Sequence, residues 1–102
     1  MRIMLRVSLP ADESNRAIMD GSLQKVMEKG MAELKPEAAY FLAENGKRTA
    51  YLFVNIDDNA DLAYVGERFF FAFNACVDAF PVMNADELGR GLPRALASIA
   101  AG

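Results

Sequence analysis

The sequence predicts an α+β fold in a single domain that spans residues 1–102. Three observations lead to this prediction. Four short apolar segments have the character of strands, two segments between them carry apolar residues at helical spacing, and Asn45-Gly46 separates the second and third strands. A chain of 102 residues matches the size of one domain and leaves no room for a second.

The first strand is predicted over residues 2–9, where every second side chain is apolar. Pro10 ends this strand. An apolar stripe at helical spacing then runs from about Asp12 to Leu34, which predicts one helix. Because a residue that precedes proline disfavours the helical conformation, the pair Lys35-Pro36 ends that helix.

The segments 38–44 and 47–56 are predicted to form a hairpin. Asn45 and Gly46 both tolerate a positive φ, as the favoured two-residue hairpin turn requires. With this turn, Tyr40 lies opposite Tyr51, and both faces of the hairpin are apolar.

A second helix is expected after the cap Asp57-Asp58-Asn59 and ends at Asn74, and a fourth strand follows over residues 75–82. Asn84 and Glu87 have the spacing of a capping box. We expect Gly89, Gly91 and Pro93 to split the tail into a short turn and a final helix that begins at Pro93.

This order of elements predicts a ferredoxin-like βαββαβ domain with a C-terminal helix. Right-handed crossovers place the strands in the antiparallel order 4-1-3-2, with both main helices on one face. The sheet side of that core is then expected to consist of Ile3, Leu5, Val7, Phe41, Leu52, Val54 and Val77.

The opposite face of the sheet is also apolar, since it would carry Met4, Tyr40, Leu42, Tyr51, Phe53 and Phe80. Its four aromatic side chains represent roughly 600–1,000 Å², whereas the largest exposed apolar patch on a monomer is about 300–600 Å². We therefore expect a homodimer in which two sheets pack face to face. The alternative is that the C-terminal helix folds back over this face.

The stretch Leu34-Lys35-Pro36-Glu37-Ala38-Ala39-Tyr40-Phe41-Leu42, followed by Asn45-Gly46-Lys47-Arg48, resembles small bacterial proteins of the dimeric α+β-barrel superfamily. The order of elements, the two-sided apolar hairpin and the helical tail add to this resemblance. The superfamily includes muconolactone isomerases, cofactor-free monooxygenases and stress-responsive barrel proteins. The resemblance implies a homodimer, but the histidines that several catalytic members use are absent here.

The composition argues against several functional classes. The net charge is −3 and the eleven basic residues form no block, which argues against nucleic-acid binding. Without histidine, a catalytic triad and a histidine-based metal site are excluded, and we expect neither metal nor cofactor. No segment approaches the ~20 apolar residues that cross a bilayer. The single cysteine, Cys76, fits a reducing cytoplasm.

Arg6 is the leading candidate for a site residue, because a guanidinium in the middle of an interior strand requires an acceptor. Asp78 on the neighbouring strand is the expected partner, and Asn55, Tyr40 and Tyr51 are expected nearby on the same face. In one interpretation these five residues line a ligand pocket between the sheets. In the other, Arg6 and Asp78 form a structural ion pair.

Two functions from different classes remain. The first is a non-catalytic homodimer that binds a small apolar or aromatic metabolite, between the sheet and the helices, or serves another interaction. The second is a cofactor-independent isomerase or monooxygenase that uses Arg6, Asp78 and Tyr51. The lack of a conventional acid–base group favours the first.

Overall fold

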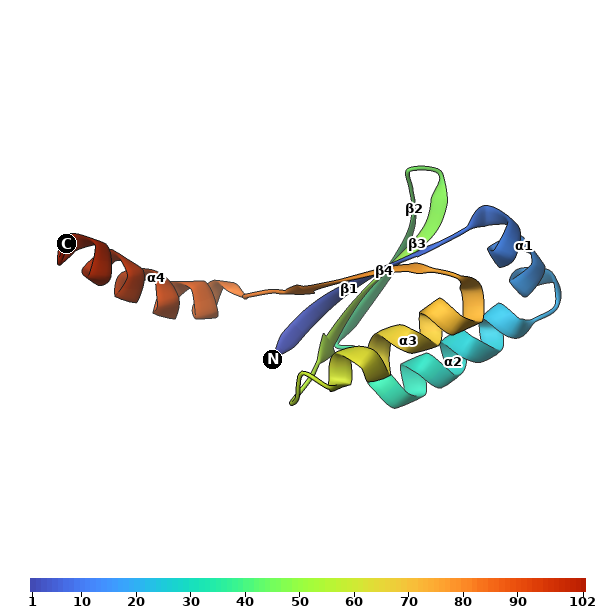
Figure 1. The fold of residues 1–102 in the computed structure, drawn as a ribbon, viewed down its shortest axis with the longest axis horizontal. Coiled ribbons are helices and arrows are strands. Elements are labelled where there is room, and N and C mark those ends of the chain that lie inside the picture. Colours follow the sequence, from blue (N-terminus) through green and yellow to red (C-terminus); the bar gives the residue numbers. More distant parts are fainter.

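The computed structural model describes residues 1–102 and contains four strands and four helices (Figure 1). The strands are β1 (Arg2–Leu9), β2 (Ala38–Glu44), β3 (Lys47–Asn55) and β4 (Cys76–Pro81), and the helices are α1 (Ala11–Met19), α2 (Ser22–Leu34), α3 (Asp61–Phe73) and α4 (Ala85–Ala100). The strands form one antiparallel sheet in the order β2-β3-β1-β4. Read from the other edge, this is the predicted order 4-1-3-2, so the ferredoxin-like α+β fold is confirmed.

The β2–β3 hairpin has the predicted register. Asn45 and Gly46 form the turn, with φ values of 54° and 74°, so both positions lie in the left-handed region that asparagine and glycine tolerate. Tyr40 lies opposite Tyr51, and Glu44 lies opposite Lys47. The turn chemistry alone was therefore sufficient to fix which residues face each other across the hairpin.

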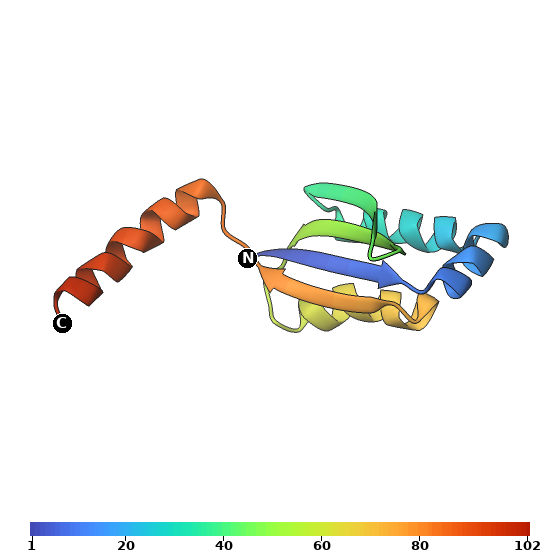
Figure 2. The same ribbon diagram turned by 90° about the horizontal axis from the view of Figure 1, so that it is seen from above.

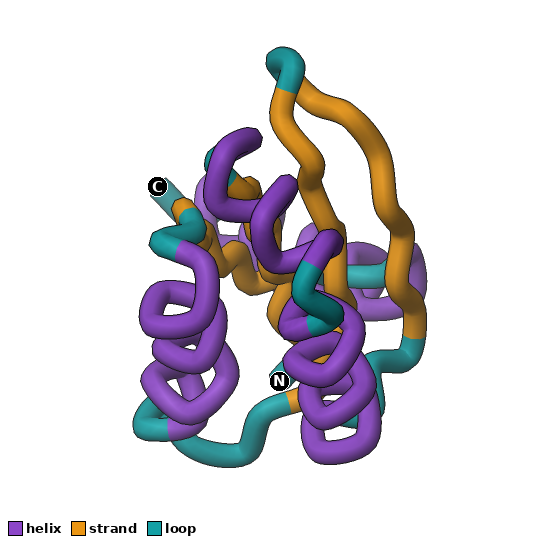
Figure 3. The backbone as a smooth tube through the Cα atoms, turned by 90° about the vertical axis from the view of Figure 1, so that its right-hand side faces the viewer, coloured by secondary structure: helices purple, strands orange, loops and turns teal.

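The core lies between the sheet and the pair of helices α2 and α3, which run side by side along one face (Figures 1 and 3). Side chains from alternate positions of β1 and β3 are buried against α3. The most deeply buried are Ile3, Leu5, Leu52, Val54, Phe69 and Phe73, each at most 2% exposed. Full burial of one such side chain contributes about 1.5–3 kcal/mol, so this layer provides most of the stability.

Phe41 was predicted to belong to this core, but it does not. It faces the helical side of the sheet but is 64% exposed, because the turn end of the hairpin extends beyond the helical layer (Figure 1). Val77 is only partly buried but does pack against the core, as expected.

The expected single helix over residues 12–34 is instead two helices. α1 ends at Met19 with Asp20 as its C-cap, and Gly21 has a φ of 81°, which turns the chain before α2 begins. The Asp20 carboxylate accepts a hydrogen bond from the Ser22 backbone N–H at 2.8 Å. Since glycine adopts this conformation without steric cost, Asp20-Gly21-Ser22 was the signal for the break, and the apolar periodicity obscured it.

The predicted split of the tail is also wrong. α4 runs without a break from Ala85 to Ala100, with Pro93 in its interior. Its start is as expected, since Asn84 and Glu87 form a complete capping box. Pro93 removes one backbone donor from the helix, but the alanine and leucine residues around it favour the helical state.

α4 projects away from the rest of the molecule (Figures 1 and 2), and none of its residues is buried. The chain is therefore elongated, with extents of 60 × 28 × 19 Å and a radius of gyration of 17.0 Å, against about 13 Å for a compact domain of this size. Within one chain, the tail does not cover the second face of the sheet. That face is open.

Candidate functional site

An apolar pocket of about 390 Å³ opens between α2, α3 and the hairpin end of the sheet. This volume lies within the range of small-ligand sites, about 300–1,000 Å³. Nine of its eleven lining residues are hydrophobic. The lining consists of Val7, Leu9, Leu23, Met27, Phe41, Leu42, Arg48, Thr49, Ala50, Phe69 and Phe73.

The pocket exists because a small residue lies between two larger ones on adjacent strands. Ala50 of β3 is opposite Val7 of β1 on one side and Phe41 of β2 on the other. The short Ala50 side chain leaves space above the sheet, and the twist that lifts the hairpin away from the helices keeps this space open. The buried Phe69 and Phe73 of α3 close its inner end.

Sequence reasoning did not find this pocket. Its lining comes from five separate elements, and nearly every lining residue is of a type that also builds cores. The available signal was the mismatch in size between Phe41 and Ala50, which the hairpin register already placed opposite each other. A small residue paired with a large one near a hairpin end indicates either tight packing or a cavity, and only the position of the helices distinguishes the two.

Arg48 is the charged residue of the pocket. Its Nη1 donates to Ser14 Oγ and to Asn15 Oδ1, both at 2.7 Å. Ser14 is fully buried and also donates to the Ala11 carbonyl at 3.2 Å. These two contacts fix the guanidinium while its Nε and Nη2 donors form no hydrogen bond within the chain. Arg48 can therefore present a planar pair of donors to an acceptor in the pocket.

The residues predicted as a site lie on the other face of the sheet. Asp78, Arg6, Tyr51 and Tyr40 are directly opposite one another on β4, β1, β3 and β2. They form a row across all four strands, which we call the cross-strand row. The structure thus brings four of the five predicted residues together. Asn55 is exposed at the end of β3, opposite Arg2, and belongs to neither group.

Hydrogen bonds already engage three members of the cross-strand row, Asp78, Arg6 and Tyr51. Arg6 Nη2 donates to Asp78 Oδ2 at 3.0 Å, which, together with a hydrogen bond to Tyr51, raises the pKa of Arg6. Tyr51 Oη donates to Glu44 at 2.8 and 3.0 Å, which raises the pKa of that phenol. Sequence reasoning had not placed Glu44 here. Both carboxylates accept hydrogen bonds, and the tyrosine stays protonated at neutral pH.

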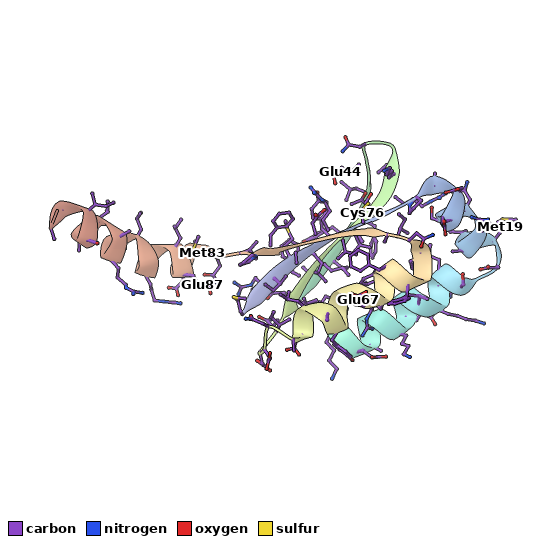
Figure 4. All side chains as sticks on the ribbon, in the orientation of Figure 1. Met19, Glu44, Glu67, Cys76, Met83 and Glu87 are labelled. Atoms are coloured by element: carbon purple, nitrogen blue, oxygen red, sulfur yellow. The ribbon has the colours of Figure 1, made fainter.

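A small polar hollow of about 220 Å³ borders this row, and Glu44 and Cys76 are among its lining residues. Figure 4 labels both side chains. The Arg6 guanidinium also lies over the Phe80 ring, 5.7 Å from its centre. The Arg6 and Asp78 side chains are 38% and 49% exposed in the single chain. The row is therefore held together by its own contacts but open to solvent on the side away from the helices.

No group of three or more acidic or cysteine side chains is arranged to hold a metal ion. None of the helices has both the length and the apolar character that a bilayer crossing requires.

Neither a protein-family model nor a curated protein sequence matches this chain. Among solved structures, it is similar to a formyltetrahydrofolate deformylase from Pseudomonas putida KT2440, with a TM-score of 0.51 and 16% sequence identity. The match covers 80% of this chain and 29% of the deformylase. This similarity supports the ferredoxin-like α+β fold, and the chain corresponds to less than a third of the longer protein.

Proposed function

We propose that this protein is a homodimer of the α+β-barrel type that binds a small apolar or aromatic carboxylate between its sheet and its helices. The apolar pocket is the observation that carries this proposal. It is open to solvent, it is large enough for a small metabolite, and its only charged side chain is Arg48.

The apolar lining and Arg48 favour a ligand with two unlike ends. Met27, Phe69 and Phe73 would contact the apolar body, which gains affinity as its surface leaves water. The free edge of the Arg48 guanidinium would pair with a carboxylate in the fork geometry that arginine provides. Because Ser14 and Asn15 already hold Arg48 in place, less side-chain entropy is lost on binding.

This proposal places the ligand away from the cross-strand row. In the row, Arg6 is paired with Asp78 and Tyr51 with Glu44, so a ligand there would have to displace existing hydrogen bonds. We assign the row to the dimer interface, where these internally satisfied polar groups can be covered by a second sheet. The pocket lining contains no carboxylate or thiol, which supports binding rather than acid–base chemistry.

The experiment compares 4-phenylbutyrate with its neutral analogue 4-phenylbutan-1-ol, using titration calorimetry together with amide chemical-shift mapping. We expect both compounds to shift the amide signals of β1, α2 and α3 residues around the pocket. Arg48→Gln should weaken 4-phenylbutyrate by about tenfold, as expected for the loss of one charge-assisted pair of hydrogen bonds, and should leave the alcohol unchanged.

Lys47→Gln is the matched control, since it removes the same charge from the neighbouring residue, which does not line the pocket. A pocket-filling variant, Ala50→Leu, should reduce the binding of both compounds. Shifts confined to other parts of the chain, or equal weakening by Lys47→Gln and Arg48→Gln, would refute the proposal.

A further inference from the structure

A second hollow adjoins the apolar pocket along α2, and we call it the α2 groove. It has a volume of about 420 Å³, is open to solvent, and is lined by Gln24, Met27, Glu28, Met31 and Phe41. Met27 and Phe41 line the apolar pocket as well. The two spaces therefore meet at these two side chains, and together they form a longer binding surface than the pocket alone.

This surface leads away from Arg48. Arg48 lies opposite Leu9 at the end of β1, and Figure 2 shows that α2 begins at this end of the sheet and runs back along it. Leu23, Met27 and Met31 are four residues apart and so lie along one side of α2. Leu23 lines the pocket only, Met27 lines both spaces, and Met31 lines the groove only. Because eight helical residues span about 12 Å, the surface extends about that far from Leu23 to Met31.

The boundary between the two spaces consists of side chains that can move aside. Methionine is unbranched and has three rotatable side-chain bonds, so Met27 can adapt to the shape of a ligand. Phe41 is exposed, and no other element of the chain covers its ring. A ligand that fills the pocket can therefore continue into the α2 groove without any change in the backbone.

The charges at the two ends of this surface are opposite. Arg48 provides free donors at the end that lies in the pocket. At the groove, the exposed side chain of Gln24 donates from Nε2 to Glu28 Oε1 at 3.0 Å, which holds a carboxylate at the rim. Since like charges repel, Glu28 disfavours a second anionic group at the far end. The arrangement selects a ligand with one anionic end and one apolar end.

We infer that the ligand of this site is an unbranched alkyl monocarboxylate of about ten carbons, with its carboxylate at Arg48 and its chain along α2 as far as Met31. The inference rests on the proposed function and specifies its ligand class. An extended carbon chain advances about 1.3 Å per bond, so about ten carbons cover the distance from Leu23 to Met31. A compact acid such as 4-phenylbutyrate fills the pocket but leaves Met31 uncovered.

The dependence of affinity on chain length is the first test. Titration calorimetry compares hexanoate, octanoate and decanoate. Full burial of one methylene group raises affinity about fourfold. Because the groove is open on one side and buries about half of the chain, we expect about twofold per methylene, so decanoate should bind about fifteenfold more tightly than hexanoate. Decanoate, but not hexanoate, should also shift the amide signals of residues 28–31.

A substitution at Met31 separates the groove from non-specific adsorption of the chain. Met31→Gln should weaken decanoate by about fivefold and leave hexanoate unchanged, while Met31→Leu, which keeps an apolar side chain, should retain the affinity. Circular dichroism checks that both variants keep their helices. Met19→Gln is the matched control, because Met19 lies at the exposed end of α1 (Figure 4) and lines neither space.

A second carboxylate tests the role of Glu28. Decanedioate, which has a carboxylate at both ends, should bind less tightly than decanoate. Glu28→Gln should strengthen decanedioate by about threefold and leave decanoate unchanged. Glu67→Gln is the matched control, since it removes the same charge from an exposed position on α3 (Figure 4) that lines neither space.

The outcomes distinguish this inference from the proposed function. If 4-phenylbutyrate binds in the pocket but hexanoate and decanoate bind equally, the extended ligand is overturned and the proposed function stands. Equal weakening of decanoate by Met19→Gln and Met31→Gln, or amide shifts from decanoate that do not reach residues 28–31, would also overturn it. If none of the carboxylates binds, including 4-phenylbutyrate, both proposals are overturned.

Discussion

The two faces of the sheet are built from the same strands, yet they are entirely different surfaces. On the helical face, Leu5, Leu52 and Val54 are each 1% exposed. The side chains of the other face include Tyr40 of β2 at 64% exposure and Phe80 of β4 at 39%. Apolar character is similar on both faces. The difference is that the chain supplies helices for one face and nothing for the other.

This contrast supports the proposal that a second subunit covers the open face. Four of its polar side chains are paired, Asp78 with Arg6 and Tyr51 with Glu44. Polar groups that are satisfied within the sheet can be covered without leaving an unpaired donor or acceptor.

The prediction with the largest expected effect tests whether the helical face alone determines the stability of the single chain. Leu52→Ala should lower the free energy of unfolding by about 2–5 kcal/mol, because it opens a cavity in the core. Tyr40→Ala, on the other face, should change it by less than about 0.5 kcal/mol at concentrations where the chain is monomeric. Urea denaturation measures both. A comparable loss from the two variants would show that the open face already contributes to the stability of the single chain.

The strands of this fold could be predicted from the sequence because each is a local pattern. Alternation defined β1, and the turn residues Asn45 and Gly46 defined the hairpin and its register. The predictions failed where a local rule competed with a longer-range one. A helical stripe concealed the break at Gly21, and Pro93 indicated a helix start where the capping box at Asn84 had already begun one.

The candidate site shows the same limit. The cross-strand row was predictable, since register and alternation place Arg6 beside Asp78 and Tyr51. The apolar pocket was not, because its volume depends on how far the hairpin extends beyond α2, which no residue pattern specifies. Arg48 was missed for a related reason: its partners Ser14 and Asn15 lie more than thirty residues earlier in the chain.

Arg6→Ala is expected to have little effect on the stability of the single chain but a clear effect on dimer formation. In the single chain the Arg6–Asp78 pair is partly exposed, and such pairs contribute little to stability. If a second sheet covers the pair, loss of the guanidinium leaves the Asp78 charge unpaired at the interface. The dimer dissociation constant should then rise by at least about tenfold, as measured by sedimentation equilibrium. Arg94→Ala is the control, and an equal effect from it would remove Arg6 from the interface.

Cys76 offers a probe of the same face that requires no substitution. It is the only cysteine and is exposed in the single chain, on the face of the sheet that carries Arg6 and Asp78. A covered face should slow the reaction of this thiol with a disulfide reagent by about tenfold relative to the unfolded chain, and dilution should restore the rate. A fast rate that does not change with concentration would mean that this end of the face stays open.

The smallest effect concerns the junction between the sheet and α4. Hydrogen bonds from the Asn84 backbone N–H and then from Arg2 lower the pKa of Glu87 below its ordinary 4.5. A carboxylate with a lowered pKa stabilises the folded state above its ordinary pKa, and this contribution is lost as the pH falls through the lowered value. Acidification from pH 6 to about pH 3 should therefore loosen the first turn of α4, measured by hydrogen exchange of its amides.

Two variants test whether Glu87 is responsible. Arg2→Gln should raise the pKa of Glu87 only part of the way towards its ordinary value, because the larger contribution, from Asn84, remains. Glu87→Gln, which keeps a hydrogen-bonding side chain at the capping position, should abolish the transition. If it persists in that variant, a different group controls the direction in which α4 leaves the sheet.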